Sequence, residues 1–193
     1  KRILLEVMVQ NSVGLFLIMP VFLPVLVASQ ALAGEKERRT LEPLLAAPIS
    51  PAQLVLGKTL AAMLPALAIS TLAFAVFAVG ADLITYPLVG RLLLPDGMFF
   101  FAVLVLAPLL SFLGTTLSVA ISARVGDSRL AQTLSGLVVM PFAAVVVLQV
   151  VGLLQLGPGT YLGLAVGALA ADVVMLRLAV RLFDRERLLT RWA

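Results

Sequence analysis

The sequence has no cysteine and no histidine, and only 12% of its 193 residues are charged. Without cysteine and histidine the chain has no disulfide, no thiol nucleophile, no serine–histidine pair and no histidine-based zinc site. Zinc-dependent and serine-type intramembrane proteases are therefore excluded. An aspartyl protease of the membrane needs two acids within apolar segments, and the sequence offers only Asp172 there. We therefore expect no catalytic site in this chain.

The low charge goes together with a very high apolar content. Apolar residues make up 62% of the chain, and the mean hydropathy is +1.13. A soluble domain usually carries about twice this charged fraction, and disordered chains have low hydrophobicity. Both classes are excluded, which leaves a polytopic membrane protein with an all-α fold.

Five apolar segments are long enough to cross a bilayer as helices, since about 20 residues match a hydrocarbon core of roughly 30 Å. We expect a single transmembrane domain over residues 1–193. The predicted spans are approximately residues 13–33, 60–81, 99–123, 130–154 and 161–183.

Lysine and arginine are concentrated in alternate breaks between these spans, as they are in short cytoplasmic loops. They occur in the breaks at 34–58 and 124–129 and in the tail 184–193, whereas the breaks at 82–98 and 155–160 hold one arginine between them. This pattern predicts a cytoplasmic C-terminus and places the start of the chain on the outer side. The basic tail is expected to form an amphipathic helix along anionic headgroups. The excess of positive charge thus reflects topology rather than nucleic-acid binding.

The first two residues, Lys1 and Arg2, fit the outer side poorly. The chain begins with lysine rather than methionine, and five spans place its ends on opposite sides of the membrane. We expect a further span before residue 1, which gives six in the full-length protein. A native five-span protein that is processed at its N-terminus is the alternative.

The most informative stretch, residues 34–58, reads GEKERRTLEPLLAAPISPAQLVLGK. A charged exit from the first span is followed by a short amphipathic helix, for which Thr40 is the expected N-cap and Pro48 the end. Ser50 and Gln53 then form a Ser-x-x-Gln capping box that starts the next helix. The sequence predicts two helices with a sharp break between them at the cytoplasmic surface, which in a generic membrane protein could simply lie in the interface.

This stretch resembles the segment that marks ABC transporter type-2 permeases, the membrane subunits of many bacterial exporters. In that family a Gly-Glu-Lys-Glu-Arg-Gly-Thr-Leu-Glu-like run precedes a Leu-Leu-x-x-Pro-x-Ser element and a Gly-Lys pair. The matching residues are Gly34, Glu35, Lys36, Glu37, Arg38, Thr40, Leu41, Glu42, Leu44, Leu45, Pro48, Ser50, Gly57 and Lys58. Arg39 stands where the family frequently has glycine, which we interpret as a surface variation.

A second and weaker resemblance lies at residues 127–141. Related permeases enter their penultimate span through an Ala-Gln pair and carry a proline about nine residues later. Ala131, Gln132 and Pro141 fit this pattern.

The resemblance implies a mechanism. Two permeases, identical or related, form a transmembrane pathway in the cytoplasmic membrane of a bacterium or archaeon, and separate ATPase subunits, which hold ATP and Mg, dock below them. The helix at about residues 40–47 would be the coupling element, with leucines as apolar anchors and charged residues setting its orientation. The implied ATPase-contact residues are Glu35, Glu37, Arg38, Arg39, Thr40, Leu41, Glu42, Leu44, Leu45, Pro48 and Ser50.

The chain itself is not expected to bind ATP or any other cofactor. The run Gly57-Lys58-Thr59 resembles the end of a phosphate loop, but that motif requires glycine at position 52, where the sequence has Ala52, and no strand precedes it. Energy must therefore come from a partner chain.

Two features within the spans leave alternatives open. Asp172 lies near the middle of the last span, where a charge is costly, so it either lines a pathway or ion site or is a buried acid satisfied by neighbouring hydroxyls. Gly159, Gly163 and Gly167 form a small-xxx-small stripe that allows close helix packing, either within one permease or between two protomers.

The interpretation that we adopt is the permease subunit of an ATP-driven exporter. A non-transporting membrane scaffold or sensor subunit remains an alternative, as does an ion-coupled secondary carrier that uses Asp172. Similar permeases handle drugs, lipids, polysaccharides, peptides and ions, so the sequence identifies no substrate.

Overall fold

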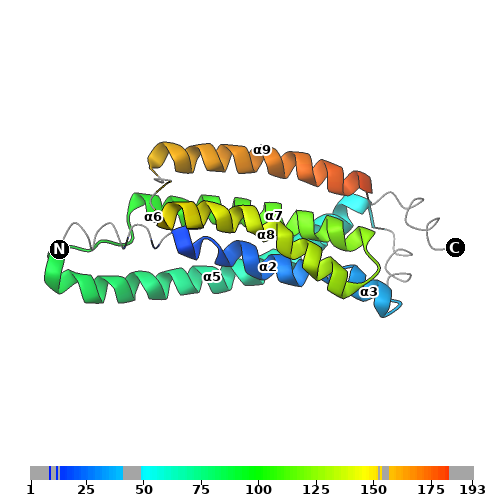
Figure 1. Cartoon of the computed structure of the whole chain (residues 1–193), viewed down its shortest axis with the longest axis horizontal. Helices are drawn as coiled ribbons and strands as arrows, with labels where there is room; N and C mark the ends of the chain where they lie inside the picture. The colour runs from blue at the N-terminus through cyan, green and yellow to red at the C-terminus, as the bar shows by residue number, and fades with distance from the viewer. Residues whose placement is uncertain are drawn as a thin grey trace.

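The computed structural model of the chain describes residues 9, 12, 14–40, 49–151, 153 and 157–182. These residues form helices and connecting turns, and no strand occurs among them. In this described part, five helical segments are long and apolar enough to cross a membrane (Figure 1). The predicted all-α, polytopic fold is confirmed.

The first span, Gly14–Glu37, is interrupted. Its main helix α2 (Met19–Ser29) is followed by a turn and then by the short helix α3 (Ala33–Glu37). The other spans are α5 (Pro51–Val89), the composite of α6 (Gly97–Phe101), the π-helix η1 (Ala102–Leu106) and α7 (Ala107–Arg124), then α8 (Ser128–Val150) and α9 (Pro158–Leu182).

Helix α5 is much longer than the span predicted at about 60–81. It begins at the expected capping box, in which the Ser50 hydroxyl accepts from the Gln53 N–H and the Gln53 side chain accepts from the Ser50 N–H. It ends at Gly90, which adopts a left-handed conformation with φ 79°. Its 39 residues make a rod of about 58 Å at 1.5 Å per residue. The helix is therefore about twice as long as the hydrocarbon core is thick, roughly 30 Å.

The extra length of α5 brings Asp82 into the helix, whereas the sequence placed it in a break. Asp82 is buried, and its carboxylate accepts hydrogen bonds from the backbone N–H groups of Leu93 (2.8 Å) and Leu94 (3.1 Å). Asp172 is thus not the only acid buried within a long apolar helix. The acceptor role of Asp82 ties the segment after α5 back onto the helix.

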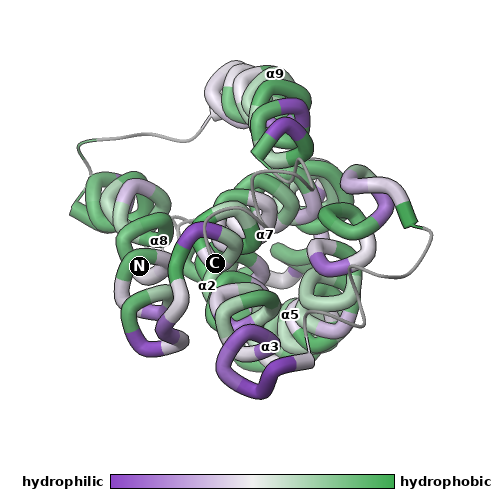
Figure 2. Tube along the Cα trace, turned by 90° about the vertical axis from the view of Figure 1, so that its right-hand side faces the viewer, coloured by the Kyte–Doolittle hydropathy of each residue, from purple (hydrophilic) through white to green (hydrophobic). Residues whose placement is uncertain are grey.

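Helices α2 and α7 form the centre of the bundle. Helix α2 packs against α5, α7 and α8, while α9 lies on the outer side of α7 (Figure 2). Gly114 allows α2 and α7 to approach closely, because a Cβ there would lie 3.0 Å from Val25 Cγ2 and 3.2 Å from Val21 Cγ1. Ser118 adds a buried polar contact across this interface by donating to the Val25 carbonyl oxygen at 2.9 Å.

The surface of the bundle is apolar along much of its length. On α5, Leu72 and Val76 are 67% and 73% exposed, and large apolar side chains on α8 and α9 are exposed as well. Apolar exposure on this scale is abnormal for a protein in water and is expected where helices face lipid tails. Hydrophilic residues are drawn at α3, at the connection between α7 and α8, and on α9 (Figure 2).

Candidate functional site

The candidate site is the helix α3, which was not predicted as a helix. It leaves α2 through a turn at residues 30–32 and has no side-chain cap of its own at its N-terminus. Ser122 of α7 supplies the missing acceptor, since its hydroxyl oxygen lies 3.1 Å from the Leu32 nitrogen and 2.9 Å from the Ala33 nitrogen. A buried serine of another span therefore fixes the start of α3, where backbone N–H groups would otherwise lack partners.

The last three residues of α3, all of them charged, contact three different spans. The first, Glu35, forms an ion pair with Lys58 of α5. Both side chains are about one-quarter exposed, 26% for Glu35 and 23% for Lys58, so the pair is partly shielded from solvent. Lys58 thus holds the beginning of α5 against α3.

Lys36 reaches the end of α7. Its ammonium group donates to the carbonyl oxygens of Ala123 at 2.5 Å and Val125 at 3.1 Å. The last carbonyl groups of a helix have no partner within it, and a cation there also interacts favourably with the helix dipole. Lys36 therefore acts as a C-terminal cap that comes from outside the helix.

Glu37 reaches the start of α8. Its carboxylate accepts a hydrogen bond of 2.7 Å from the Ser128 N–H, the first residue of that helix. The next two N–H groups, of Arg129 and Leu130, donate to the N-cap Asp127 at 2.6 and 3.1 Å. Two carboxylates thus share the donors at this positive helix end. We call α3, with its partners Lys58, Ala123, Val125 and Ser128, the α3 junction.

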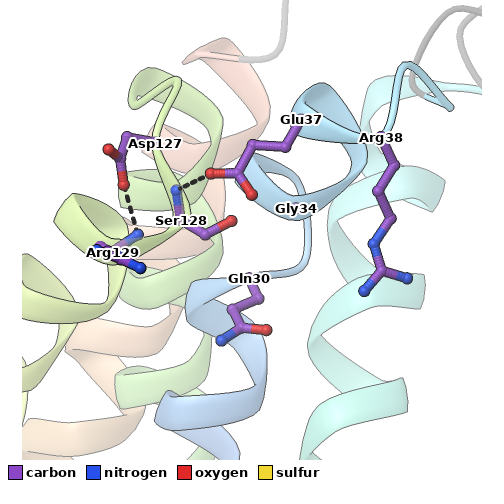
Figure 3. A pocket seen from close by; sticks show the side chains of 7 residues that line it. All are labelled: Gln30, Gly34, Glu37, Arg38, Asp127, Ser128 and Arg129. Carbon is purple, nitrogen blue, oxygen red and sulfur yellow. Dashed lines mark hydrogen bonds between the residues drawn. The ribbon is translucent and has the colours of Figure 1, made fainter.

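A polar pocket of about 390 Å³ lies beside the α3 junction (Figure 3). Figure 3 shows Glu37 and Ser128 joined across it, with Gln30 below them and Arg38 on the opposite side. The pocket brings together the two stretches that carry the sequence resemblance, although they are about 90 residues apart. Its lining residues are Gln30, Gly34, Glu37, Arg38, Asp127, Ser128 and Arg129.

The end of α3 explains the residue type that the family prefers at position 39. The N–H of Thr40 bonds to the Glu35 carbonyl at 2.9 Å, and the N–H of Arg39 bonds to the Lys36 carbonyl at 3.1 Å. This pair of bonds is a Schellman motif, in which the residue after the C-cap is left-handed and usually glycine. Arg39 has φ 57°, so it occupies the glycine position. The interpretation of Arg39 as a mere surface variation is incomplete, because the position has a backbone requirement.

The predicted ATPase-contact residues fall into three groups. Glu35 and Glu37 bond within the chain, while Arg38, Arg39, Thr40 and Ser50 are exposed. The Thr40 hydroxyl donates to the Glu35 carbonyl at 3.4 Å, at the end of α3. Outside the described residues lie Leu41, Glu42, Leu44, Leu45 and Pro48, with the helix predicted at about 40–47 and the tail helix at 184–193.

The phosphate-loop-like run lies in a helix. The run Gly57-Lys58-Thr59 begins in the second turn of α5, whereas a phosphate loop precedes its helix. Lys58 is engaged with Glu35, and Thr59 is fully buried.

Asp172 and the glycine stripe lie on different faces of α9. Asp172 is 6% exposed, on the face that also buries Tyr161 and Ala165. Its Oδ1 atom is buried without a hydrogen-bond partner among the residues that the structure describes. By contrast, Gly159, Gly163 and Gly167 are exposed, and a Cβ at any of them would meet nothing within 4 Å in that part of the chain. The stripe therefore faces away from the described helices.

A second cavity, of about 190 Å³, is mainly apolar. It lies between α7, α8 and the residues that precede α2, where Leu17, Leu110 and Val145 line it beside the amide of Gln149. Asp172 lines neither this cavity nor the polar pocket. The polar groups that were not predicted as site residues lie in the α3 junction (Lys36 and Ser128) or next to it (Ser122 and Asp127).

Comparison with known proteins agrees with the resemblance in the sequence. A family model described as an ABC-2 family transporter protein matches residues 6–164, which is more than half of the chain. Neither curated proteins nor solved structures give a match. The matched range includes the α3 junction and the spans from α2 to α8, so the motifs and the helices point to one assignment. The chain belongs to the ABC-2 transporter family, whose members are transmembrane components of ABC transporters.

Proposed function

We propose that this chain is the permease subunit of an ATP-driven exporter, which forms the substrate pathway and is driven by a separate ATPase subunit through residues 34–58. The observation that carries the proposal is the α3 junction. A segment that receives force from an ATPase must be attached firmly to the spans that move. Glu35, Lys36 and Glu37 attach α3 to three spans, and three residues separate α3 from the segment 41–48.

Exposed residues next to the junction support a docking role. Arg38, Arg39 and Thr40 are exposed and lead directly into the segment where the coupling helix is expected. In this proposal Leu41, Leu44 and Leu45 insert into a groove of the ATPase, and Glu42, Pro48 and Ser50 set the orientation of the helix. Such a contact combines an apolar centre with a polar rim, as protein interfaces commonly do.

The orientation proposed for the chain follows from its charges. The α3 end of the bundle also holds the α7–α8 connection (Figure 1), and both are rich in basic residues, as cytoplasmic loops are. We place this end and the C-terminus in the cytoplasm and the start of the chain outside, in the cytoplasmic membrane of a bacterium or archaeon. A second permease copy, or a related permease, would complete the pathway, and ATP and Mg would be held by the ATPase.

The test is affinity purification of the complete natural protein from its own membrane, followed by identification of the proteins bound to it and measurement of ATP hydrolysis. We expect an ATPase subunit with a phosphate loop to be retained. In the variant Leu44→Asp, membrane insertion should persist while ATPase retention or its coupling to transport is lost. Leu92→Asp is the matched control, because Leu92 is 67% exposed in the connection that follows α5.

The other functions give different outcomes. Unchanged transport and unchanged ATPase retention in Leu44→Asp would overturn the assignment of the coupling segment. Retention of an ATPase without ATP-driven transport of any candidate substrate would indicate a scaffold or sensor subunit. Transport that requires an ion gradient and no ATPase would indicate a secondary carrier.

A further inference from the structure

We propose that Lys36 and Glu37 are positioning residues that transmit movement of the coupling segment to the α7–α8 hairpin. This inference rests on the proposed function. It names the route by which an ATPase docked at residues 41–48 would move α7 and α8, two spans that lie far from that segment in the sequence. Lys36 holds the end of α7, and Glu37 holds the start of α8. Two adjacent side chains of α3 thus bind the two ends of the connection between α7 and α8.

The hydrogen bonds at this connection cap terminal groups of both helices. The first N–H groups of α8 have no acceptor within the helix. Asp127 accepts from two of them, and the remaining Ser128 N–H donates to Glu37. At the end of α7, Lys36 contacts two carbonyl oxygens. The charges also match the helix dipoles, with a cation at a C-terminus and an anion at an N-terminus.

The start of α3 is attached to α7 through the Ser122 hydroxyl, and beyond that point the contacts of Lys36 and Glu37 are its main attachment to the hairpin. Ala33 is the only residue of α3 that is buried, so apolar packing contributes little along the rest of this helix. The pocket beside Glu37 is polar and about 390 Å³ in volume, and it separates Arg38 from Arg129 (Figure 3). Movement of α3 is therefore transmitted to α8 through Glu37 rather than through a packed surface.

Ser128 offers a substitution that removes the backbone donor together with the hydroxyl, and a second one that removes the hydroxyl alone. It is the first helical residue of α8, where proline is well tolerated because its N–H is not needed within the helix. The preceding Asp127 has φ −111° and ψ 126°, a conformation that a following proline allows. Ser128→Pro therefore deletes the bond to Glu37 while α8 is kept. Ser128→Ala is the matched control, because it loses the hydroxyl, which also contacts Glu37, but keeps the N–H that donates to Glu37 at 2.7 Å.

The readout is a fluorescent reporter on each of two helices. The chain has no cysteine, so a single introduced cysteine can be labelled with bimane before the ATPase subunit is added. Thr133→Cys reports on α8 and Gly57→Cys on α5. Both positions are exposed, and a Cβ at Gly57 meets no described atom within 4 Å. Emission is compared without nucleotide and with ATP plus orthovanadate.

We expect ATP and orthovanadate to change both signals in the natural sequence and in Ser128→Ala. In Ser128→Pro the Thr133 signal should no longer respond, while the Gly57 signal still does, because the Glu35–Lys58 contact is intact. A nucleotide response of Thr133 that persists in Ser128→Pro overturns the inference. Loss of both responses in Ser128→Pro also overturns the inference, since the effect of the substitution is then not confined to α8.

Two further variants keep the test decisive if Ser128→Pro does not fold. Glu37→Ala removes the acceptor and should abolish the Thr133 response, whereas Glu37→Gln keeps a side-chain acceptor and should restore part of it. Equal responses in these two variants would contradict the proposal. If neither reporter responds in the natural sequence, or no ATPase binds it, the proposed function fails rather than this inference.

Discussion

The carboxylate of Glu37 accepts a hydrogen bond of 2.7 Å from the backbone N–H of Ser128, a residue 91 positions further along the chain. This bond joins the two stretches that carry the family resemblance. Gly34 lies beside it, where a Cβ would come within 3.8 Å of Ser128 Oγ. The charged run that begins at Glu35 therefore connects parts of the chain, in addition to forming part of its surface. Its acids at positions 35 and 37 have partners within the chain, and Arg38 and Arg39 are exposed.

The first prediction concerns Ser122, whose hydroxyl accepts from two backbone N–H groups at the start of α3. Ser122→Ala leaves these donors buried without an acceptor, and we expect the free energy of unfolding to fall by about 1–3 kcal/mol. The measurement is the Tm of the purified protein in detergent. Ser111→Ala on the same helix is the control, because the Ser111 Oγ is buried without a partner among the described residues. Equal losses in the two variants would contradict the capping role.

The second prediction concerns Arg39, which occupies the left-handed position of a Schellman motif with φ 57°. A non-glycine residue there costs roughly 1–2 kcal/mol, so Arg39→Gly should raise the stability of the α3 end. Arg39→Val should lower it, because a β-branched residue fits this conformation poorly. The stability of the α3 end is measured by the rate of limited proteolysis after α3 and by the Tm of the protein. A lower Tm for Arg39→Gly than for Arg39→Val would refute the backbone argument.

Local patterns predicted those parts of the fold that depend on neighbouring residues. The capping box at Ser50 and Gln53 is present as expected, because it involves residues three positions apart. The five apolar helices follow from hydropathy alone. Helix α3 was not predicted, since five residues of which three are charged show no apolar period. The extension of α5 was missed because the charge of Asp82 suggested a break, whereas helix formation continues until the left-handed Gly90.

The contacts of the candidate site required the three-dimensional structure. Sequence reasoning singled out the right stretch but treated its acids as contacts for a partner. The partners of Lys36 and Glu37 are backbone atoms of residues about 90 positions away, and backbone atoms leave no signal in residue type. The ATPase contacts of Glu35, Glu37, Arg38 and Arg39 stay predictions.

The third prediction compares two glycines that differ in their surroundings. Gly114 faces Val21 and Val25 at 3.0–3.2 Å from a hypothetical Cβ, so Gly114→Ala should lower stability by about 1–3 kcal/mol through overpacking. Val25→Ala should restore part of the loss in the double variant. Gly163→Ala should not lower the stability of the single chain, since a Cβ there meets no described atom. Chemical unfolding in detergent gives the free energy of unfolding of the natural protein, of Gly114→Ala, of the double variant with Val25→Ala, and of Gly163→Ala.

The same Gly163→Ala variant distinguishes the two roles considered for the glycine stripe. Close packing of small residues is sensitive to an added methyl group. A protein that keeps its Tm and loses its dimeric state in cross-linking experiments would place the stripe between protomers. A reduced Tm with an unchanged oligomeric state would indicate packing within one chain.

The last prediction concerns Asp172, which is 6% exposed and has an Oδ1 atom without a partner among the described residues. A buried acid that stabilises the fold needs hydrogen-bond partners, since an unpaired polar group costs free energy. Asp172→Asn keeps the shape and removes the ionisable group, so we expect its yield and Tm to equal those of the natural protein. Any loss of ATP-driven transport would then be a loss of function rather than of folding. The paired measurement is the Tm and the transport rate of the reconstituted complex, with Asp82→Asn as the control. Asp82 accepts from two backbone N–H groups, so its substitution should lower the Tm. If Asp172→Asn lowers the Tm as much as Asp82→Asn does, Asp172 is a structural acid of the bundle.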